Sequence, residues 1–87
     1  MAKTRAELIG DLAQRVGVPS LTATETESIL ALAAVAAHGT GDRTSAPLVS
    51  FLAGLAAASA DDRAQSLDSF RHLTAELAPT RSEEDQG

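Results

Sequence analysis

The chain has 87 residues, no cysteine and a formal net charge of -5, from seven basic and twelve acidic side chains. Without cysteine it can hold no disulfide and no cysteine-based metal or redox site, and the acidic balance argues against binding nucleic acid through its phosphates. No apolar run reaches the roughly 18 residues that span a membrane, and the charged N-terminal residues lack the apolar core of a secretory signal. We therefore expect a cytoplasmic protein that interacts with neither membranes nor nucleic acid.

Alanine dominates the apolar composition and indicates the fold class. It accounts for 18 residues, against 19 for isoleucine, leucine, valine and phenylalanine together. Alanine is the best helix former and lets helices approach closely, while β-branched and aromatic residues are too few for a sheet. The composition predicts an all-α domain, a compact bundle of four short helices over residues 1–78 with a thin core. Residues 79–87 are acidic and lack apolar side chains, so we expect a disordered tail.

The first helix is predicted over about residues 5–16. Thr4 and Glu7 have the spacing of a capping box, and Gly17 followed by Pro19 is typical of a helix end. Apolar residues recur at steps of three and four and should form one buried stripe, made of Leu8, Ile9, Leu12, Ala13 and Val16.

The second helix is predicted to begin near Thr22, which repeats the capping-box spacing with Glu25. Residues 29–37 are apolar on every side, which is typical of a buried, central helix. The helix should end at His38, with Gly39 just beyond it.

The third helix should begin around Pro47, with Ser45 or Ala46 at its cap. Its expected core stripe consists of large side chains at helical spacing: Leu48, Phe51, Leu52 and Leu55. Its opposite, alanine-rich side is either a helix–helix seam within the monomer or a surface for a partner or a second copy.

The fourth helix is predicted over about residues 62–77, with cap chemistry from Asp61 and Asp62. Its core stripe should contain Ala64, Leu67, Phe70, Leu73 or Thr74, and Leu77.

The connection between the second and third helices is the candidate functional site, and its predicted binding residues are His38, Gly39, Arg43, Thr44, Ser45 and Pro47. In one interpretation it binds an anion or phosphate ester through the Arg43 guanidinium, the free N–H groups of the next helix and the titratable His38. In the other it is structural, with Asp42 paired to Arg43 and Ser45 capping the third helix. No Gly-Lys-Ser/Thr sequence follows, so it is not a Walker loop.

Nothing in the sequence predicts catalysis, a metal or a cofactor. The two histidines, His38 and His72, lie in different helices without clustered partners, and no serine lies in a nucleophile elbow. Residues 67–70 resemble the phosphopantetheine motif of acyl carriers, but Ser69 falls inside the last predicted helix, so we interpret it as a helix-surface serine.

Residues 36–54 carry an Ala-His-Gly element, a short arginine-containing loop, Ala-Pro-Leu and Phe-Leu-Ala-Gly. This pattern resembles a small actinobacterial domain family of unknown function, found alone or fused behind enzymes similar to molybdenum-cofactor guanylyltransferases. The residues that match it are His38, Gly39, Arg43, Ala46, Pro47, Phe51 and Gly54. The resemblance implies an accessory role near molybdopterin metabolism, with a separate nucleotidyltransferase-like enzyme as the partner.

These observations lead us to expect a non-catalytic accessory or protein-interaction module that docks through residues 38–47 and the start of the third helix. One alternative is a binder of phosphate, nucleotide or pterin at the same loop. The other is a self-associating helical protein, a homodimer through alanine-rich faces.

Overall fold

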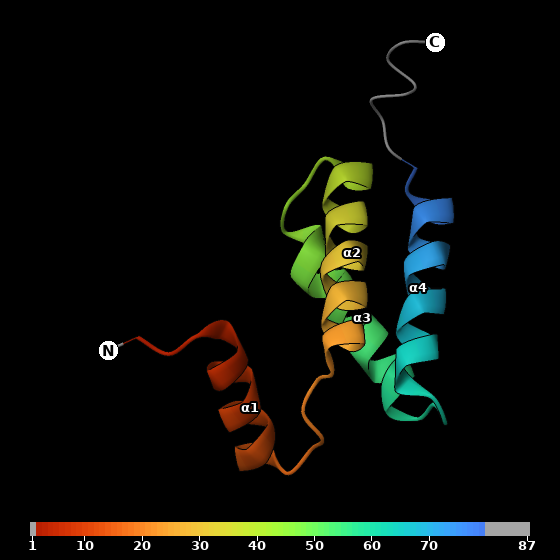
Figure 1. Cartoon of the computed structure of the whole chain (residues 1–87). Helices are drawn as coiled ribbons and strands as arrows, with labels where there is room; N and C mark the ends of the chain where they lie inside the picture. Colours follow the sequence, from red (N-terminus) through yellow and green to blue (C-terminus); the bar gives the residue numbers. More distant parts are fainter. Residues whose placement is uncertain (1, 80–87) are drawn as a thin grey trace.

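The computed structural model describes residues 2–79 and contains four α-helices (Figure 1). They are α1 (Arg5–Val16), α2 (Ala23–Thr40), α3 (Ser45–Ala58) and α4 (Arg63–Leu77). The all-α prediction with four helices is confirmed. The predicted tail lies, from residue 80 onward, outside the described residues. None of the four helices is long and apolar enough to cross a membrane.

Three of the helices form the packed part of the molecule. α2 packs against both α3 and α4, which also contact one another, whereas no Cα atom of α1 approaches these three helices within 8 Å. Figure 1 shows α1 standing beside the first turns of α2, joined to it by an extended segment. The core lies between α2, α3 and α4 and consists of Leu32, Ala53, Ala57 and Leu67, with Ile29, Val49 and Phe70 partly buried against it.

The N-terminal caps of α1, α2 and α4 form as predicted. The Glu7 N–H donates to the Thr4 hydroxyl at 3.1 Å, and the Thr4 N–H donates to the Glu7 carboxylate at 2.9 Å. Thr22 and Glu25 form the same pair of bonds, at 3.1 and 2.8 Å, and Asp62 caps α4 by accepting from the Gln65 N–H. At the end of α1, Gly17 has the predicted left-handed conformation, with φ of 76°.

The predicted end of α2 is wrong by two residues. The helix continues through Gly39 to Thr40, and Gly41 is the left-handed residue that ends it, with φ of 74°. Gly39 has a different role, because a Cβ atom there would collide with the carbonyl oxygen of Ala78, just after α4. Glycine at this position lets the end of α2 approach the end of α4.

The predicted core face of α3 is also wrong. Leu48 and Phe51 are each 67 % exposed, and Leu52 and Leu55 are each 55 % exposed. The buried side chains are alanines, Ala53 and Ala57, so α3 approaches α2 and α4 through small side chains. The question left open by the sequence is thereby answered: the side of α3 that carries these two alanines is a seam within the monomer.

Two other predicted stripes are buried only in part. On α1, Ala13 is buried, whereas Leu8, Leu12 and Val16 are about half exposed or more. On α4, Leu67 and Thr74 are buried and Leu73 and Leu77 are exposed. On α2, Leu32 and Ala36 are buried as predicted, but Leu30 is exposed. Large apolar side chains therefore remain on the surface of all four helices.

Candidate functional site

The six binding residues predicted from the sequence lie along the single connection between α2 and α3. His38 and Gly39 belong to the last turn of α2, Arg43 and Thr44 to the loop, and Ser45 and Pro47 to the first turn of α3. Gly39 and Ser45 are half-buried and the other four residues are exposed. The structure therefore brings all six residues into one region.

Hydrogen bonds within this loop occupy groups that an anion would need. The Asp42 carboxylate accepts from the Thr44 N–H at 2.9 Å and from the Thr44 hydroxyl at 2.7 Å, and these bonds lower the pKa of Asp42. The N–H of Ser45 donates to the Asp42 carbonyl at 3.0 Å. A bound anion would meet the negative charge of Asp42 at the start of α3, so ligand binding here stays a prediction without further support.

The structural details predicted for the loop are only partly correct. Thr44, rather than Ser45 or Ala46, is the N-cap residue of α3, and its side chain makes no capping bond. Ser45 instead shares a hydrogen bond of 2.9 Å with the Thr40 hydroxyl. Among residues 2–79, Asp42 is bonded to Thr44 and forms no ion pair with Arg43.

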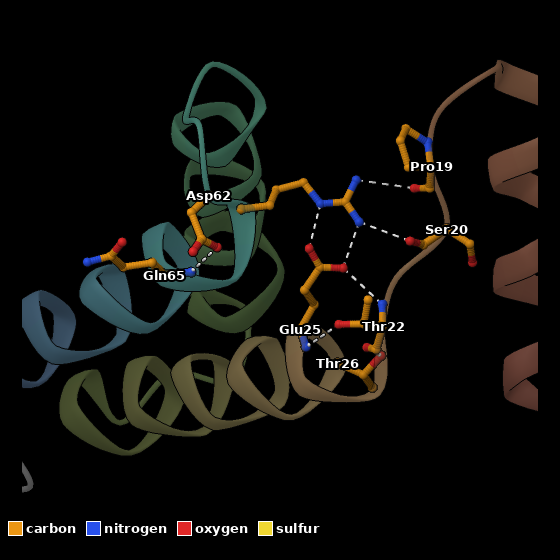
Figure 2. Close-up of polar contacts among 8 residues, drawn as sticks. Pro19, Ser20, Thr22, Glu25, Thr26, Asp62 and Gln65 are labelled. Atoms are coloured by element: carbon orange, nitrogen blue, oxygen red, sulfur yellow. Dashed lines mark hydrogen bonds and ion pairs between the residues drawn. The ribbon is translucent and has the colours of Figure 1, made fainter.

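Sequence patterns did not predict a second polar site, which lies where α4 begins. Arg63 donates from Nε and Nη2 to the two carboxylate oxygens of Glu25, at 2.6 Å each. The same guanidinium donates to the carbonyl oxygens of Ser20, at 2.9 Å, and Pro19, at 3.3 Å. As Figure 2 shows, the Glu25 carboxylate and these two carbonyl groups converge on one guanidinium.

We call this arrangement of Arg63, Glu25, Pro19 and Ser20 the arginine clamp. The Glu25 side chain is only 5 % exposed, and that of Arg63 is 29 % exposed. The bonds from Arg63 lower the pKa of Glu25 to about 2, and the N–H and hydroxyl of Thr22 add to the effect. A carboxylate that holds a proton this weakly and is fully bonded is a poor general base. The role of the clamp is structural: its bonds connect α2, α4 and the segment between α1 and α2.

Exposed apolar side chains form the other notable surface feature. Val49, Leu52, Phe70, Leu73 and Leu77 line a groove of about 230 Å³ between α3 and α4. A second groove, of about 380 Å³, separates α1 from the start of α2 and is lined in part by Ile9, Leu21 and Leu30. Within the described part of the chain, no cluster of three or more histidine, aspartate or glutamate side chains could hold a metal ion.

The comparisons with known proteins identify a family and no activity. A domain of unknown function, DUF6457, matches residues 2–86, almost the whole chain, and the chain belongs to this family. No curated protein and no solved structure matches the chain.

Proposed function

We propose that this member of the DUF6457 family is a non-catalytic protein-interaction module that presents α1 to a partner protein. The observation that carries the proposal is the stripe of Leu8, Leu12 and Val16, which are 48 %, 55 % and 70 % exposed. Their spacing of four residues gives one continuous apolar side of the helix. An amphipathic helix with an uncovered apolar side is the usual ligand of a hydrophobic groove.

The way α1 is attached to the bundle supports this role. The arginine clamp holds the carbonyl groups of Pro19 and Ser20, which follow α1 after Gly17 and Val18. Fixing this connection limits the orientations that α1 can adopt, which lowers the entropy cost of binding.

Charge defines the kind of groove that α1 fits. Arg5 lies three residues before Leu8 and Arg15 three residues after Leu12, so both project on the apolar side of the helix. Neither arginine forms an ion pair with another described residue. The matching partner surface is a hydrophobic groove with an acidic rim.

The resemblance supports a partner class, a nucleotidyltransferase similar to molybdenum-cofactor guanylyltransferases. The loop of residues 38–47 is a second candidate contact, because Arg43 and Pro47 are exposed there. In this proposal α1 provides the apolar anchor and the loop provides polar contacts at the other end of α2.

Titration calorimetry with the purified chain and a purified guanylyltransferase-like enzyme from the same genome tests the proposal. We expect Leu12→Glu to weaken binding at least 30-fold, because it places a charge in the apolar contact. Gln14→Glu adds the same charge to another exposed position of α1 and should change the affinity less than threefold. Equal effects of both substitutions, or no binding by the unsubstituted chain, would contradict the proposal, and an effect of Arg43→Ala would place the loop in the contact.

A further inference from the structure

In α3 the small apolar side chains face the core and the large ones face solvent, which is the reverse of the arrangement expected in a monomer. Its small residues, Ala53 and Ala57, face the core at 0 % and 4 % exposure. Its four large residues, which we call the outer face of α3, are Leu48, Phe51, Leu52 and Leu55, all more than half exposed. They occur at positions i, i+3, i+4 and i+7, so they form one stripe along the helix.

Two leucines of α4 extend this surface. Leu73 and Leu77 are 48 % and 77 % exposed and line the same groove as Leu52. At the areas typical of large apolar side chains, the six residues leave on the order of 600 Å² uncovered, at the top of the range for the largest patch on a monomer. A standard interface buries about 800 Å² per partner, so this patch is large enough to be the centre of one.

Charge favours a second copy of the chain as the occupant. The chain has a net charge of -5, so two copies repel one another over most orientations. Residues 45–58, however, contain no acidic or basic side chain. Two copies can therefore bring their α3 helices together without opposing like charges, and an uncharged surface offers nothing to attract a charged partner.

The small core points to the same occupant. Among the described residues the core cluster contains two leucines and two alanines, which is little for a domain of this size. Burial of the outer face of α3 against a second copy adds apolar contacts that this small core lacks, and it raises stability by mass action as the concentration of the chain rises.

We infer that the outer face of α3, with Leu73 and Leu77 at its edge, packs against the same face of a second copy across a two-fold axis. The contact is isologous, so each residue near the axis meets its own counterpart. It lies on different residues from the α1 stripe, so partner binding and self-association are independent properties.

Sedimentation equilibrium over a range of concentrations tests the inference. We expect the unsubstituted chain to sediment at twice its 8.9 kDa mass. Leu55→Glu should raise the dissociation constant of the dimer about 100-fold or more, since it places a charge on both sides of the contact. Leu12→Glu is the matched control, because Leu12 and Leu55 are both 55 % exposed, and it should leave the dimer intact.

A cysteine experiment covers the case in which Leu55→Glu loses its helicity. The chain has no cysteine of its own, so a single one can be placed at Phe51, near the middle of the outer face. Under mild oxidation Phe51→Cys should form a disulfide-linked dimer in high yield, and Leu12→Cys should not.

Three results would overturn the inference: a monomer at all concentrations, equal loss of dimer in Leu12→Glu and Leu55→Glu, or equal cross-linking of the two cysteine variants. The proposed function fails separately. Loss of enzyme binding in Leu55→Glu but not in Leu12→Glu would contradict the proposed role of α1, and it would not contradict the inference that the chain forms a dimer.

Discussion

Arg63, at the start of α4, bonds to residues that lie 38 to 44 positions earlier in the chain. Its guanidinium bonds to Glu25 in α2 and to the carbonyl groups of Pro19 and Ser20 before α2. Glu25 in turn accepts from the Thr22 N–H, so its buried charge is fully bonded. Replacing a whole buried ion pair by apolar groups is often harmless, but removing one partner leaves the other charge uncompensated.

Arg63→Ala should therefore lower the free energy of unfolding by about 2–4 kcal/mol. The reason is that Glu25 stays buried after losing its counter-ion. Urea unfolding followed by circular dichroism measures the change. Arg71→Ala is the matched control: Arg71 pairs with Asp68 on the surface, where the carboxylate side chain is 51 % exposed, and its loss should cost less than about 1 kcal/mol. Similar losses in the two variants would show that the clamp contributes no more than a surface pair.

The clamp also predicts a pH dependence of stability. The pKa of Glu25 is lowered from 4.5 to about 2 in the folded chain, so the unfolded chain binds its proton more readily. The stabilisation is fully present above about pH 4.5 and is lost as the pH falls toward 2, a change of about 2–3 kcal/mol. Urea midpoints measured between pH 6 and pH 2.5 should fall in the unsubstituted chain and fall much less in Glu25→Gln. Asp68→Asn should keep the original slope, because the Asp68 carboxylate is half exposed; a flat profile in the unsubstituted chain would contradict the prediction.

The difference between the capping boxes and the clamp shows what a sequence pattern can reveal. Thr22 and Glu25 were predicted to cap α2 because both bonds join residues three positions apart. Arg63 lies 38 residues from Glu25, and no local spacing indicates that pair. Finding it required the folded arrangement of α2 and α4.

At the scale of the elements, the ends of α2 and α4 meet at one very close contact. A Cβ atom at Gly39 would collide with the Ala78 carbonyl oxygen and would lie 2.7 Å from the Ala78 Cβ atom. From the sequence, Gly39 was interpreted as the residue that ends α2, because a helix end and a close contact between helices both favour glycine. Only the structure distinguishes Gly39, inside the helix, from Gly41, which has a positive φ.

This contact gives opposite expectations for two glycines inside helices. Gly39→Ala should lower the free energy of unfolding by about 1–2 kcal/mol, because the methyl group forces Ala78 and the last turn of α4 away. Gly54→Ala should raise it by about 0.5–1 kcal/mol, since a Cβ atom at Gly54 meets nothing within 4 Å and alanine favours the helix. Thermal and urea unfolding of both variants provide the test. Stabilisation by Gly39→Ala would mean that the end of α4 moves away at no cost.

The orientation of α3 illustrates a second limit of sequence patterns. Helical spacing correctly grouped Leu48, Phe51, Leu52 and Leu55 on one side of the helix. It could not decide whether this side or the alanine side faces the core, because both are apolar. The structure places Ala53 at 0 % exposure and Phe51 at 67 %, a choice that depends on how closely the three helix axes approach.

At the scale of the whole molecule, stability resides in α2, α3 and α4. These helices share the core cluster, whereas every Cα atom of α1 lies more than 8 Å from the Cα atoms of the other three helices. The segment after α1 belongs to the bundle, because Arg63 bonds to Pro19 and Ser20 and Thr22 caps α2. The border of the cooperative unit should therefore fall between Val16 and Pro19.

Two truncations locate this border. A variant lacking residues 1–16 should unfold within about 1 kcal/mol of the full chain, because the core, the clamp and the Thr22 cap are all retained. A variant lacking residues 1–22 loses the two carbonyl acceptors and the cap, and should be destabilised by about 2–4 kcal/mol. Circular dichroism should also show the first variant losing the signal of the 12-residue α1 and keeping the sharp transition of the bundle. If the variant lacking residues 1–16 is unfolded at room temperature, α1 belongs to the cooperative unit. The apolar stripe of α1 would then have to be covered within the folded protein.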